Sequence, residues 1–479
     1  MCENCNRREF LETGAMASML WAAGGVLYGE EAAPKPAELP TMPEKVRIAA
    51  IFTGGPTPCD RGWGVCEEEI AAMQNYLKEV ETKLGNVEFV VGRANTPEET
   101  AKILEQAGDE APVLAINLCI GGLLRASKPI LETNRPMAVY SAPASGHDWM
   151  YPFRWRQEGK PVTLMASSDR AELERAARIL RVIPLMRHSR IVAFAPLQGT
   201  TAACQPEKIK ERLGPTVIIV PQKRFDDLLA SVDESKAKAE AEAWIRGAKK
   251  VIEPTEEDVL KAARVSLALD QLMEEEKAQG LAVGTCMGWL QRGFPCLGFT
   301  RLRDRGIPAS CEGDMDSLLT MMLFWYMVNL PGFQGNATFD TAKNALWTAH
   351  CVGPLKMDGP NGEPAPYLLR SHSEIGGGVV PEIQYRIGQK ITRTKLINLD
   401  TLLISTGTIR EVPEKSVRAC RTQIVTEIGD AAKMVRHWGG GVLEGSMMTL
   451  LHRVVFYGDH MQSARHLTDL MQMRLVEEG

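Results

Sequence analysis

Two carboxylates in the second half of the chain stand where a metal or a proton could be handled. Glu312-Gly313-Asp314 follows the apolar segment Ile307–Cys311, which is typical of a strand, and an apolar helix is predicted from Ser317 onward. The carboxylates therefore fall at the carboxyl end of a strand, where α/β sheets bind ligands. Carboxylate oxygens suit a hard divalent cation and can serve as a base. A structural alternative is that Asp314 and Asp316 only favour a helix N-terminus.

Two histidines farther along the chain could add nitrogen ligands. His350 follows a predicted strand, Ala345–Thr348, and precedes a turn. His452 interrupts the apolar run within Leu450–Asp459. A buried imidazole needs a hydrogen-bond partner or a metal. Each histidine taken alone is more often structural than a ligand, so only their combination with the carboxylates points to a site.

The elements that must position these groups fall into three series. In the first, residues 45–187, short apolar strands alternate with helices, a pattern that favours a parallel sheet. Its strands are predicted at Val46–Gly54, Val87–Gly92, Ala111–Asn117 and Met137–Ser141, with helices at about Glu67–Thr82 and after the N-cap Thr96. The second series, residues 188–332, carries Glu312. It is predicted to contain strands at Arg190–Pro196 and Thr216–Pro221, a long helix from Phe225 to about Lys250, another at Glu256–Gln279, and a further short strand into which Gly280–Gly284 leads.

The third series, residues 333–479, carries His350 and His452 and differs from the first two in composition and in hydrophobic pattern. Glycine and proline become dense, and Ile391–Ile397 and Leu402–Thr408 alternate like antiparallel strands. A closing helix is predicted at about Met461–Val476. The fold class predicted is α/β, with two consecutive doubly wound parallel-sheet domains followed by a β-rich C-terminal domain.

Composition excludes several classes of protein. The chain has 479 residues, 44% hydrophobic and 24% charged, which is ordinary for a globular protein of two or three domains. A net charge of −5 gives no reason to expect nucleic acid or an anionic membrane as partner. No apolar run after the N-terminal region reaches 18 residues, so we expect no stable membrane insertion of the mature chain.

The N-terminal region resembles a twin-arginine export leader. Arg7-Arg8 precedes Phe10-Leu11, a weakly apolar run follows over Ala15–Tyr28, and a polar stretch comes next. The resemblance implies a signal peptide at residues 1–33, the twin-arginine export machinery as a partner, and a periplasmic or other extracytoplasmic location. The alternative is a cytosolic chain with a basic, amphipathic start.

The cysteines do not suggest a disulfide framework. Two of the eleven, Cys2 and Cys5, lie in the predicted leader, and the other nine show no repeating interval. Exported chains often contain disulfides. The odd number and the irregular spacing nevertheless argue against a framework.

The order of the polar motifs resembles that of the L-fucose isomerase-like family, which includes the L-arabinose isomerases. Cys-Glu-Gly-Asp stands at 311–314, Gly-Asn at 335–336, Ala-His-Cys at 349–351, and His452 comes shortly before Gly-Asp at 458–459. The most distinctive segment is Leu302–Glu312, and the segments 370–374 and 376–378 also look like the family's C-terminal domain. The likeness is loose over 45–280 and more specific over 285–460.

The resemblance implies a metal-dependent aldose–ketose isomerase that acts on a pentose or deoxyhexose through an ene-diolate. In that family a divalent metal, usually manganese, is held by two carboxylates and a histidine, and it acts as a Lewis acid on the sugar carbonyl. Carried over by position, Glu312 is a metal ligand and the acid/base, His452 is a ligand, and His350 lies near the metal. The place of the second carboxylate falls on Asn336, whose amide oxygen can bind a metal but cannot carry a proton. Asp340 is the nearest carboxylate that could replace it as a catalytic group.

The resemblance also suggests substrate contacts and assembly. Trp289, Arg301 and His372 are candidate sugar-binding residues, although Trp289 could equally be a packing residue. A homo-oligomer is expected, because sites in this family are often completed by neighbouring subunits.

Two other functions compete with the isomerase. A nicotinamide-dependent oxidoreductase would need a glycine-rich turn after the first strand, but Thr53–Pro58 lacks the pattern, and two prolines remove amide donors from it. An exported, non-catalytic sugar-binding protein on the isomerase scaffold would fit the loss of a carboxylate at Asn336.

Overall fold

The computed structural model describes residues 39, 41–60, 62–284, 286–414, 418–438 and 445–478. The predicted export leader, residues 1–33, lies outside the described residues. Residues Pro40–Gly479 form one compact unit. Among the helices that the structure describes, none has both the length and the apolar character needed to span a bilayer.

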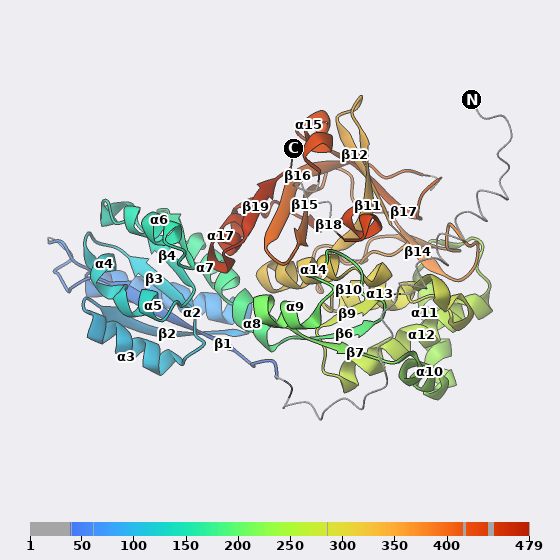
Figure 1. Ribbon diagram of the computed structural model, residues 1–479, viewed down its shortest axis with the longest axis horizontal. Helices are drawn as coiled ribbons and strands as arrows, with labels where there is room; N and C mark the ends of the chain where they lie inside the picture. Colours follow the sequence, from blue (N-terminus) through green and yellow to red (C-terminus); the bar gives the residue numbers. More distant parts are fainter. Residues whose placement is uncertain are drawn as a thin grey trace. The chain divides into compact units, whose positions relative to one another are not determined.

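The first part of this unit is built on a five-stranded parallel sheet (Figure 1). The strands lie in the order β2-β1-β3-β4-β5. Their bounds are β1 Val46–Thr53, β2 Val87–Ala94, β3 Val113–Asn117, β4 Met137–Ser141 and β5 Val162–Ala166. The helices of this part are α2 Glu67–Leu84, α3 Pro97–Ala107, α4 Gly122–Ala126, α5 Lys128–Glu132, α6 Met150–Gln157, α7 Ala171–Leu180 and α8 Val182–His188. The four predicted strands are confirmed, and β5 is an addition.

The start of α3 shows why local sequence predicts it well. The Thr96 hydroxyl accepts a hydrogen bond from the backbone N–H of Glu99, and the Glu99 carboxylate accepts one from the backbone N–H of Thr96. This capping box, followed by Pro97 in the first turn, satisfies amides that have no partner within the helix.

A second parallel sheet follows, with the order β10-β9-β6-β7. Its strands are β6 Arg190–Phe194, β7 Thr216–Ile219, β9 Gly280–Val283 and β10 Ala309–Ser310, and its helices are α9 Pro206–Leu213, α10 Gln222–Ser231, α11 Glu234–Gly247, α12 Glu256–Glu275, α13 Cys296–Asp304 and α14 Met315–Val328. The single long helix predicted from Phe225 to Lys250 is wrong. Its residues form α10 and α11, because Val232 and Asp233 are extended and the Asp233 carboxylate caps α11 by accepting the N–H of Lys236.

The last part contains a closed antiparallel sheet. The order β15-β18-β11-β12-β17-β16 closes into a ring because β16 also pairs with β15. The strands are β11 Phe333–Asp340, β12 Ala345–His350, β15 Lys390–Ile397, β16 Thr401–Glu411, β17 Thr422–Glu427 and β18 His452–Tyr457, with helices α15 Ala431–His437, α16 Met447–Leu450 and α17 Met461–Met471. The coarse fold prediction, parallel α/β sheets followed by a β-rich part, is confirmed.

The end of the chain differs from its prediction. The helix predicted to reach Val476 ends at Met471, because Gln472 adopts a left-handed conformation with φ 51°. The chain then forms β19, Arg474–Glu477, which pairs in parallel with β16.

Contacts across the three predicted segments bind them into one unit. A small sheet joins β8, Lys250–Val251, to β13, Tyr367–Arg370, and β14, Val380–Ile383. Helix α17 packs on β5, where the Thr163 hydroxyl lies 2.8 Å from Nδ1 of His466. The C-terminal segment therefore contacts the first parallel sheet through β5 and pairs with the second segment through β8.

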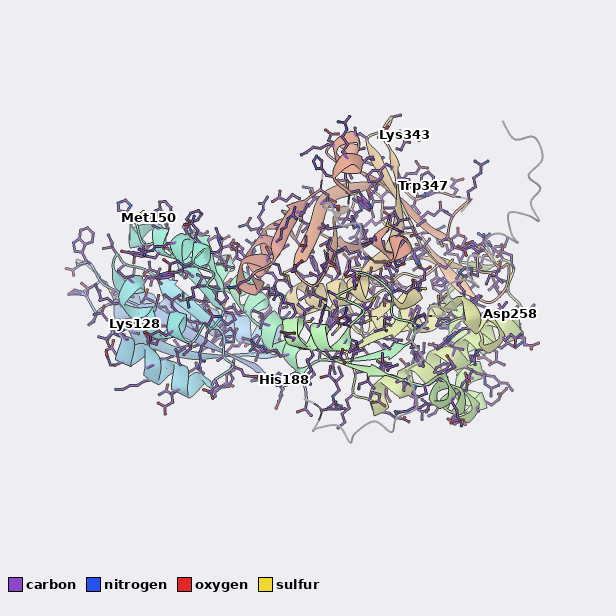
Figure 2. The ribbon with its side chains drawn as sticks, viewed as in Figure 1. Lys128, Met150, His188, Asp258, Lys343 and Trp347 are labelled. Atoms are coloured by element: carbon purple, nitrogen blue, oxygen red, sulfur yellow. A yellow bond between two sulfur atoms is a disulfide. The ribbon has the colours of Figure 1, made fainter. Side chains whose placement is uncertain are left out.

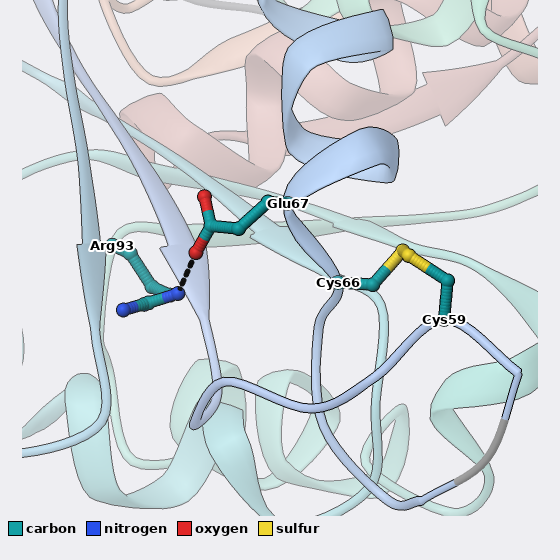
Figure 3. Close-up of a disulfide and its surroundings, with 4 residues drawn as sticks. All are labelled: Cys59, Cys66, Glu67 and Arg93. Carbon is teal, nitrogen blue, oxygen red and sulfur yellow. Dashed lines mark hydrogen bonds and ion pairs between the residues drawn. A yellow bond between two sulfur atoms is a disulfide. The ribbon is translucent and has the colours of Figure 1, made fainter.

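One disulfide lies in the loop between β1 and α2 (Figure 3). It joins Cys59 to Cys66, next to the ion pair between Glu67 and Arg93. The remaining seven cysteines of the described residues are free. Cysteine spacing gives no reason to expect the one pair that forms.

Candidate functional site

A tight turn at the carboxyl end of β10 holds the predicted carboxylate Glu312. Glu312 and Gly313 both have positive φ angles, 60° and 66°. A Cβ atom on Gly313 would stand 2.6 Å from the carbonyl oxygen of Pro196 and 2.9 Å from Cα of Gly284. Glycine is therefore required where the turn meets the loops that follow β6 and β9. These two strands flank the point where the strand order reverses, which is the usual ligand position in such sheets.

Asp314 lies beneath this turn instead of reaching outward with Glu312. Its carboxylate caps α14, accepting hydrogen bonds from the backbone N–H and the hydroxyl of Ser317. The Lys395 ammonium donates to the same carboxylate at 2.8 Å, and both side chains are fully buried. Burial opposes ionisation, but Lys395 and then His452 hold the pKa of Asp314 well below its usual range. The helix-capping interpretation of Asp314 is thus correct, and the residue also supports the site.

The contact with Asp314 decides which ring nitrogen of His452 is available. Nδ1 of His452 lies 2.9 Å from Oδ2 of Asp314 and 3.1 Å from the amide nitrogen of Gln334. The other ring nitrogen, Nε2, has no hydrogen bond within the described residues. That nitrogen lies 3.4 Å from Oε2 of Glu312. A carboxylate on the far side of a histidine ring is the usual support of a metal-binding histidine.

Sheet register brings Asn336 and His350 to the same place. In the pairing of β11 with β18, Asn336 stands opposite His452. In the pairing of β11 with β12, Asn336 stands opposite Ala349, the residue before His350. The rings of His350 and His452 meet edge to face with their centres 5.2 Å apart. Three of the predicted residues, Asn336, His350 and His452, therefore lie together in the fold although they are spread over more than a hundred positions of the sequence.

Several polar atoms at this point lack a partner. Within the part of the chain that the structure describes, no hydrogen bond reaches Oδ1 of Asn336, either ring nitrogen of His350, or Nε2 of His452. His350 is only 3% exposed, and burial lowers its pKa well below the usual value, which keeps the ring neutral. Buried polar atoms without partners are rare in folded proteins. Their clustering beside the Glu312 carboxylate fits a bound cation.

The structure does not bring Asp340 to this cluster. It lies four residues beyond Asn336 on β11, about 13 Å along the strand. There its carboxylate accepts the backbone N–H of Lys343 in the turn of the β11–β12 hairpin, and Figure 2 shows Lys343 at the tip of that hairpin. Asp340 has a local turn-stabilising contact and does not fill the place of a second carboxylate.

Two of the three expected sugar contacts lie elsewhere. Trp289 is buried in an aromatic cluster, with its ring centre 4.5 Å from that of Phe225 and 5.4 Å from that of Phe194. Arg301 projects from α13 into ion pairs with Glu240 and Asp270, beside a separate cavity of about 380 Å³. These surroundings make Trp289 a packing residue and Arg301 part of a charged network between helices.

His372 lies close to the cluster. Its ring stacks on Phe294 with centres 4.9 Å apart. Burial disfavours its charge, but a hydrogen bond with Cys351, which follows His350 in sequence, outweighs burial and raises the pKa of His372. His372 is therefore the one expected sugar contact that the fold places beside the cluster.

Three residues of the site were not anticipated. Cys311 directly precedes Glu312, and its Sγ, a Glu312 carboxylate oxygen and a His350 ring nitrogen lie within 4.8 Å of one another. Gln334 positions this turn, because its amide oxygen accepts the backbone N–H of Cys311. Lys395 could have been found from sequence, since a lysine inside the apolar run Ile391–Ile397 must have a buried partner.

Comparisons with known proteins leave the family open. No protein-family model matches the chain, and no curated protein matches it significantly. The likeness to the L-fucose isomerase-like family therefore depends on the motifs around Glu312, Asn336, His350 and His452.

Proposed function

We propose that this chain is a metal-dependent aldose–ketose isomerase for a pentose or deoxyhexose, similar to the L-fucose and L-arabinose isomerases. One observation carries the proposal. Nε2 of His452 and Oε2 of Glu312 face each other at 3.4 Å, beside buried polar atoms that have no hydrogen-bond partner in the described residues. A divalent cation bound between these groups would give each of them a partner.

The residues present fit a divalent cation. Glu312, His452, His350 and Asn336 would hold it, through carboxylate, imidazole and amide groups that are common metal ligands. A divalent cation bound there supplies a Lewis acid that polarises a sugar carbonyl and stabilises the negative charge of an ene-diolate. The resemblance to the family implies manganese.

Proton transfer falls to Glu312. Converting an aldose to a ketose moves one proton from C2 to C1 and a second, the hydroxyl proton, from O2 to O1. The Glu312 side chain is 34% exposed, whereas the Asp314 carboxylate is buried and committed to Lys395 and His452. A single carboxylate on one face of the ene-diolate can take the proton from C2 and return it to C1.

The amide at Asn336 also favours a second candidate, a non-catalytic sugar-binding protein. Asn336 faces His452 where the family has a carboxylate, and it cannot exchange protons. The single-base route does not need that carboxylate, so we place the isomerase first. Turnover separates the two candidates.

The proposal also includes the topology of the two parallel-sheet domains, the export of the protein and its oligomeric state. We propose that both parallel sheets are the cores of doubly wound domains, which the order β2-β1-β3-β4-β5 and the almost complete burial of β1 support. Export through the twin-arginine machinery to the periplasm and assembly into a homo-oligomer are proposed from the sequence alone.

The test is isomerisation by the full chain, loaded with manganese and given a panel of pentoses and deoxyhexoses. We expect ketose formation, and in heavy water deuterium should enter at C1 or C2. Glu312→Gln should lower the rate by about 10²–10⁴-fold, the usual contribution of a positioned acid/base. Asp340→Asn serves as the control and should keep the rate, because that carboxylate lies in the hairpin turn.

The outcomes separate the candidates. Sugar binding without conversion or isotope exchange would support the binding protein. A loss of rate in Asp340→Asn with full activity in Glu312→Gln would reject the site as described. Neither binding nor conversion, with any sugar in the panel, would reject both functions.

A further inference from the structure

The sulfur of Cys311 stands among the proposed metal ligands. Cys311 Sγ, a Glu312 carboxylate oxygen and a His350 ring nitrogen are mutually within 4.8 Å. Ligands that share one zinc ion each lie about 2.0–2.3 Å from it, so they are at most about 4.6 Å apart. The three donor atoms thus need only a small adjustment to contact one cation.

A second, independent observation also points to a ligand at this place. His350 is 97% buried, and neither of its ring nitrogens has a hydrogen-bond partner in the described residues. An imidazole that makes no hydrogen bond in a closed environment loses its solvation without compensation. A metal bound by one ring nitrogen removes that deficit.

Hydrogen bonds with Gln334 hold the backbone of Cys311 in the turn. The backbone N–H of Cys311 donates to the Gln334 amide oxygen at 3.1 Å, and the Gln334 amide N–H points back to the Cys311 carbonyl at 3.3 Å. Cys286, from the segment after β9, lies with its Sγ 3.2 Å from Sγ of Cys311. Either sulfur of this pair can donate to the other, so Cys286 packs directly against the proposed ligand.

We propose that Cys311 is a ligand of the cation held by Glu312, His350 and His452, so that this centre takes a thiophilic divalent metal and prefers zinc to manganese. The inference rests on the proposed metal centre and changes its chemistry. Thiolate and imidazole ligands select zinc and cobalt, whereas manganese and magnesium favour oxygen ligands. A sulfur ligand therefore overrides the manganese preference that the family resemblance implies.

Cobalt titration of the metal-free full chain tests this directly. A thiolate ligand produces an intense sulfur-to-cobalt charge-transfer band in the near ultraviolet, which histidine and carboxylate ligands do not. We expect this band at one cobalt per chain. Zinc should bleach it at stoichiometric amounts, and manganese should do so only in large excess.

Two variants test whether the charge-transfer band comes from the sulfur of Cys311. Cys311→Ser should abolish it and weaken zinc binding on the order of 100-fold, with little effect on manganese binding. Cys296→Ala is the matched control, because Cys296 is also buried nearby but is not among the grouped donor atoms, and it should retain the band. Far-ultraviolet circular dichroism checks that both variants fold.

Each remaining result overturns a defined claim. Cobalt binding that His452→Ala abolishes, but without a charge-transfer band in the wild-type chain, would reject the sulfur ligand and leave the metal centre intact. A band that survives Cys311→Ser but is lost in Cys286→Ser would show that Cys286 is the sulfur ligand and would reject the role proposed for Cys311. Cobalt binding that is insensitive to His452→Ala would reject the metal centre together with the inference.

Discussion

Asp314 connects the stability of the fold to the chemistry of the site. One buried carboxylate caps α14, pairs with Lys395 and orients His452. Because Nδ1 of His452 is committed to Asp314, Nε2 is directed at Glu312. The same residue therefore anchors an element and orients the ring of a proposed ligand.

Replacing Asp314 tests this role. We expect Asp314→Asn to lower metal affinity about 10–100-fold, since the carboxylate no longer holds the His452 ring. The variant should also be less stable by about 3–5 kcal/mol, because Lys395 is left buried without its counter-ion. Competition with a chromogenic chelator measures the affinity, and urea denaturation measures the free energy of unfolding.

Asp316→Asn is the control for this experiment. Asp316 is equally buried, but it accepts hydrogen bonds from Thr200 and has no contact with His452 among the described residues. Burial raises its pKa to about 7, so an amide is a mild change there. Equal loss of metal affinity in both variants would contradict the proposed role of Asp314.

For single residues, the order of the family motifs predicted the residues of the site better than nearness to Glu312 in the sequence did. Glu312, His350, Asn336 and His452 converge as the family motifs imply. Trp289 and Arg301 precede Glu312 closely in sequence, yet their side chains face an aromatic core and a charged helix network. Sequence nearness carries no information about the direction of a side chain once a helix such as α13 intervenes.

At the level of elements, register explains the site. The pairing of β11 with β18 and with β12 places Asn336 between His452 and Ala349. A shift of one residue in either pairing would move Asn336 to the other face of the sheet. Strand alternation can be predicted from sequence, but the partner and register of a strand depend on the folded chain.

Helix α17 offers a test of element packing by pH. Burial and then the nearby arginines lower the pKa of His466 to about 4. Between pH 6.5, the ordinary histidine pKa, and about pH 4, the unfolded chain binds a proton that the folded chain does not. The free energy of unfolding should therefore fall as pH falls through this window, by on the order of 3 kcal/mol from His466.

His466→Gln should remove this part of the pH dependence. Urea denaturation at several pH values measures it as the difference between wild type and variant, in which the contribution of Asp469, whose pKa burial raises, cancels. An unchanged slope in His466→Gln would show that the ring is accessible to protons in the folded state.

Helices and strands that are marked by a capping motif or an apolar run in their own sequence were predicted well. Elements that depend on contacts with other parts of the fold were not. The capping box of α3 and the apolar runs of β1 to β4 are readable from sequence. The break between α10 and α11 depends on Asp233 acting as a cap inside a charged helical stretch. Strand β19 forms because β16 offers it an edge, which no local pattern encodes.

For the whole molecule, the proposed cation would join distant parts of the chain. Glu312 follows the second parallel sheet, whereas His452 and His350 belong to the closed sheet. A ligand that binds only the folded state stabilises it, by about 2.7 kcal/mol at a hundred times its Kd. We expect zinc to raise the unfolding temperature by a few degrees and a chelator to reverse the shift.

Differential scanning calorimetry with and without metal measures this effect. The shift should disappear in His452→Ala and persist in His437→Ala, which changes an exposed ring on α15. A shift that persists in His452→Ala would place the stabilising metal elsewhere in the molecule.

The position of the disulfide has a consequence for how the molecule is made. Among the nine cysteines of the described residues, Cys59 and Cys66 are the closest in sequence, only seven positions apart. Short loops close with the least loss of chain entropy, so in the unfolded chain Cys59 and Cys66 meet more readily than any other pair among these nine. This preference favours the native bond over disulfides that would consume the thiols of Cys286 and Cys311.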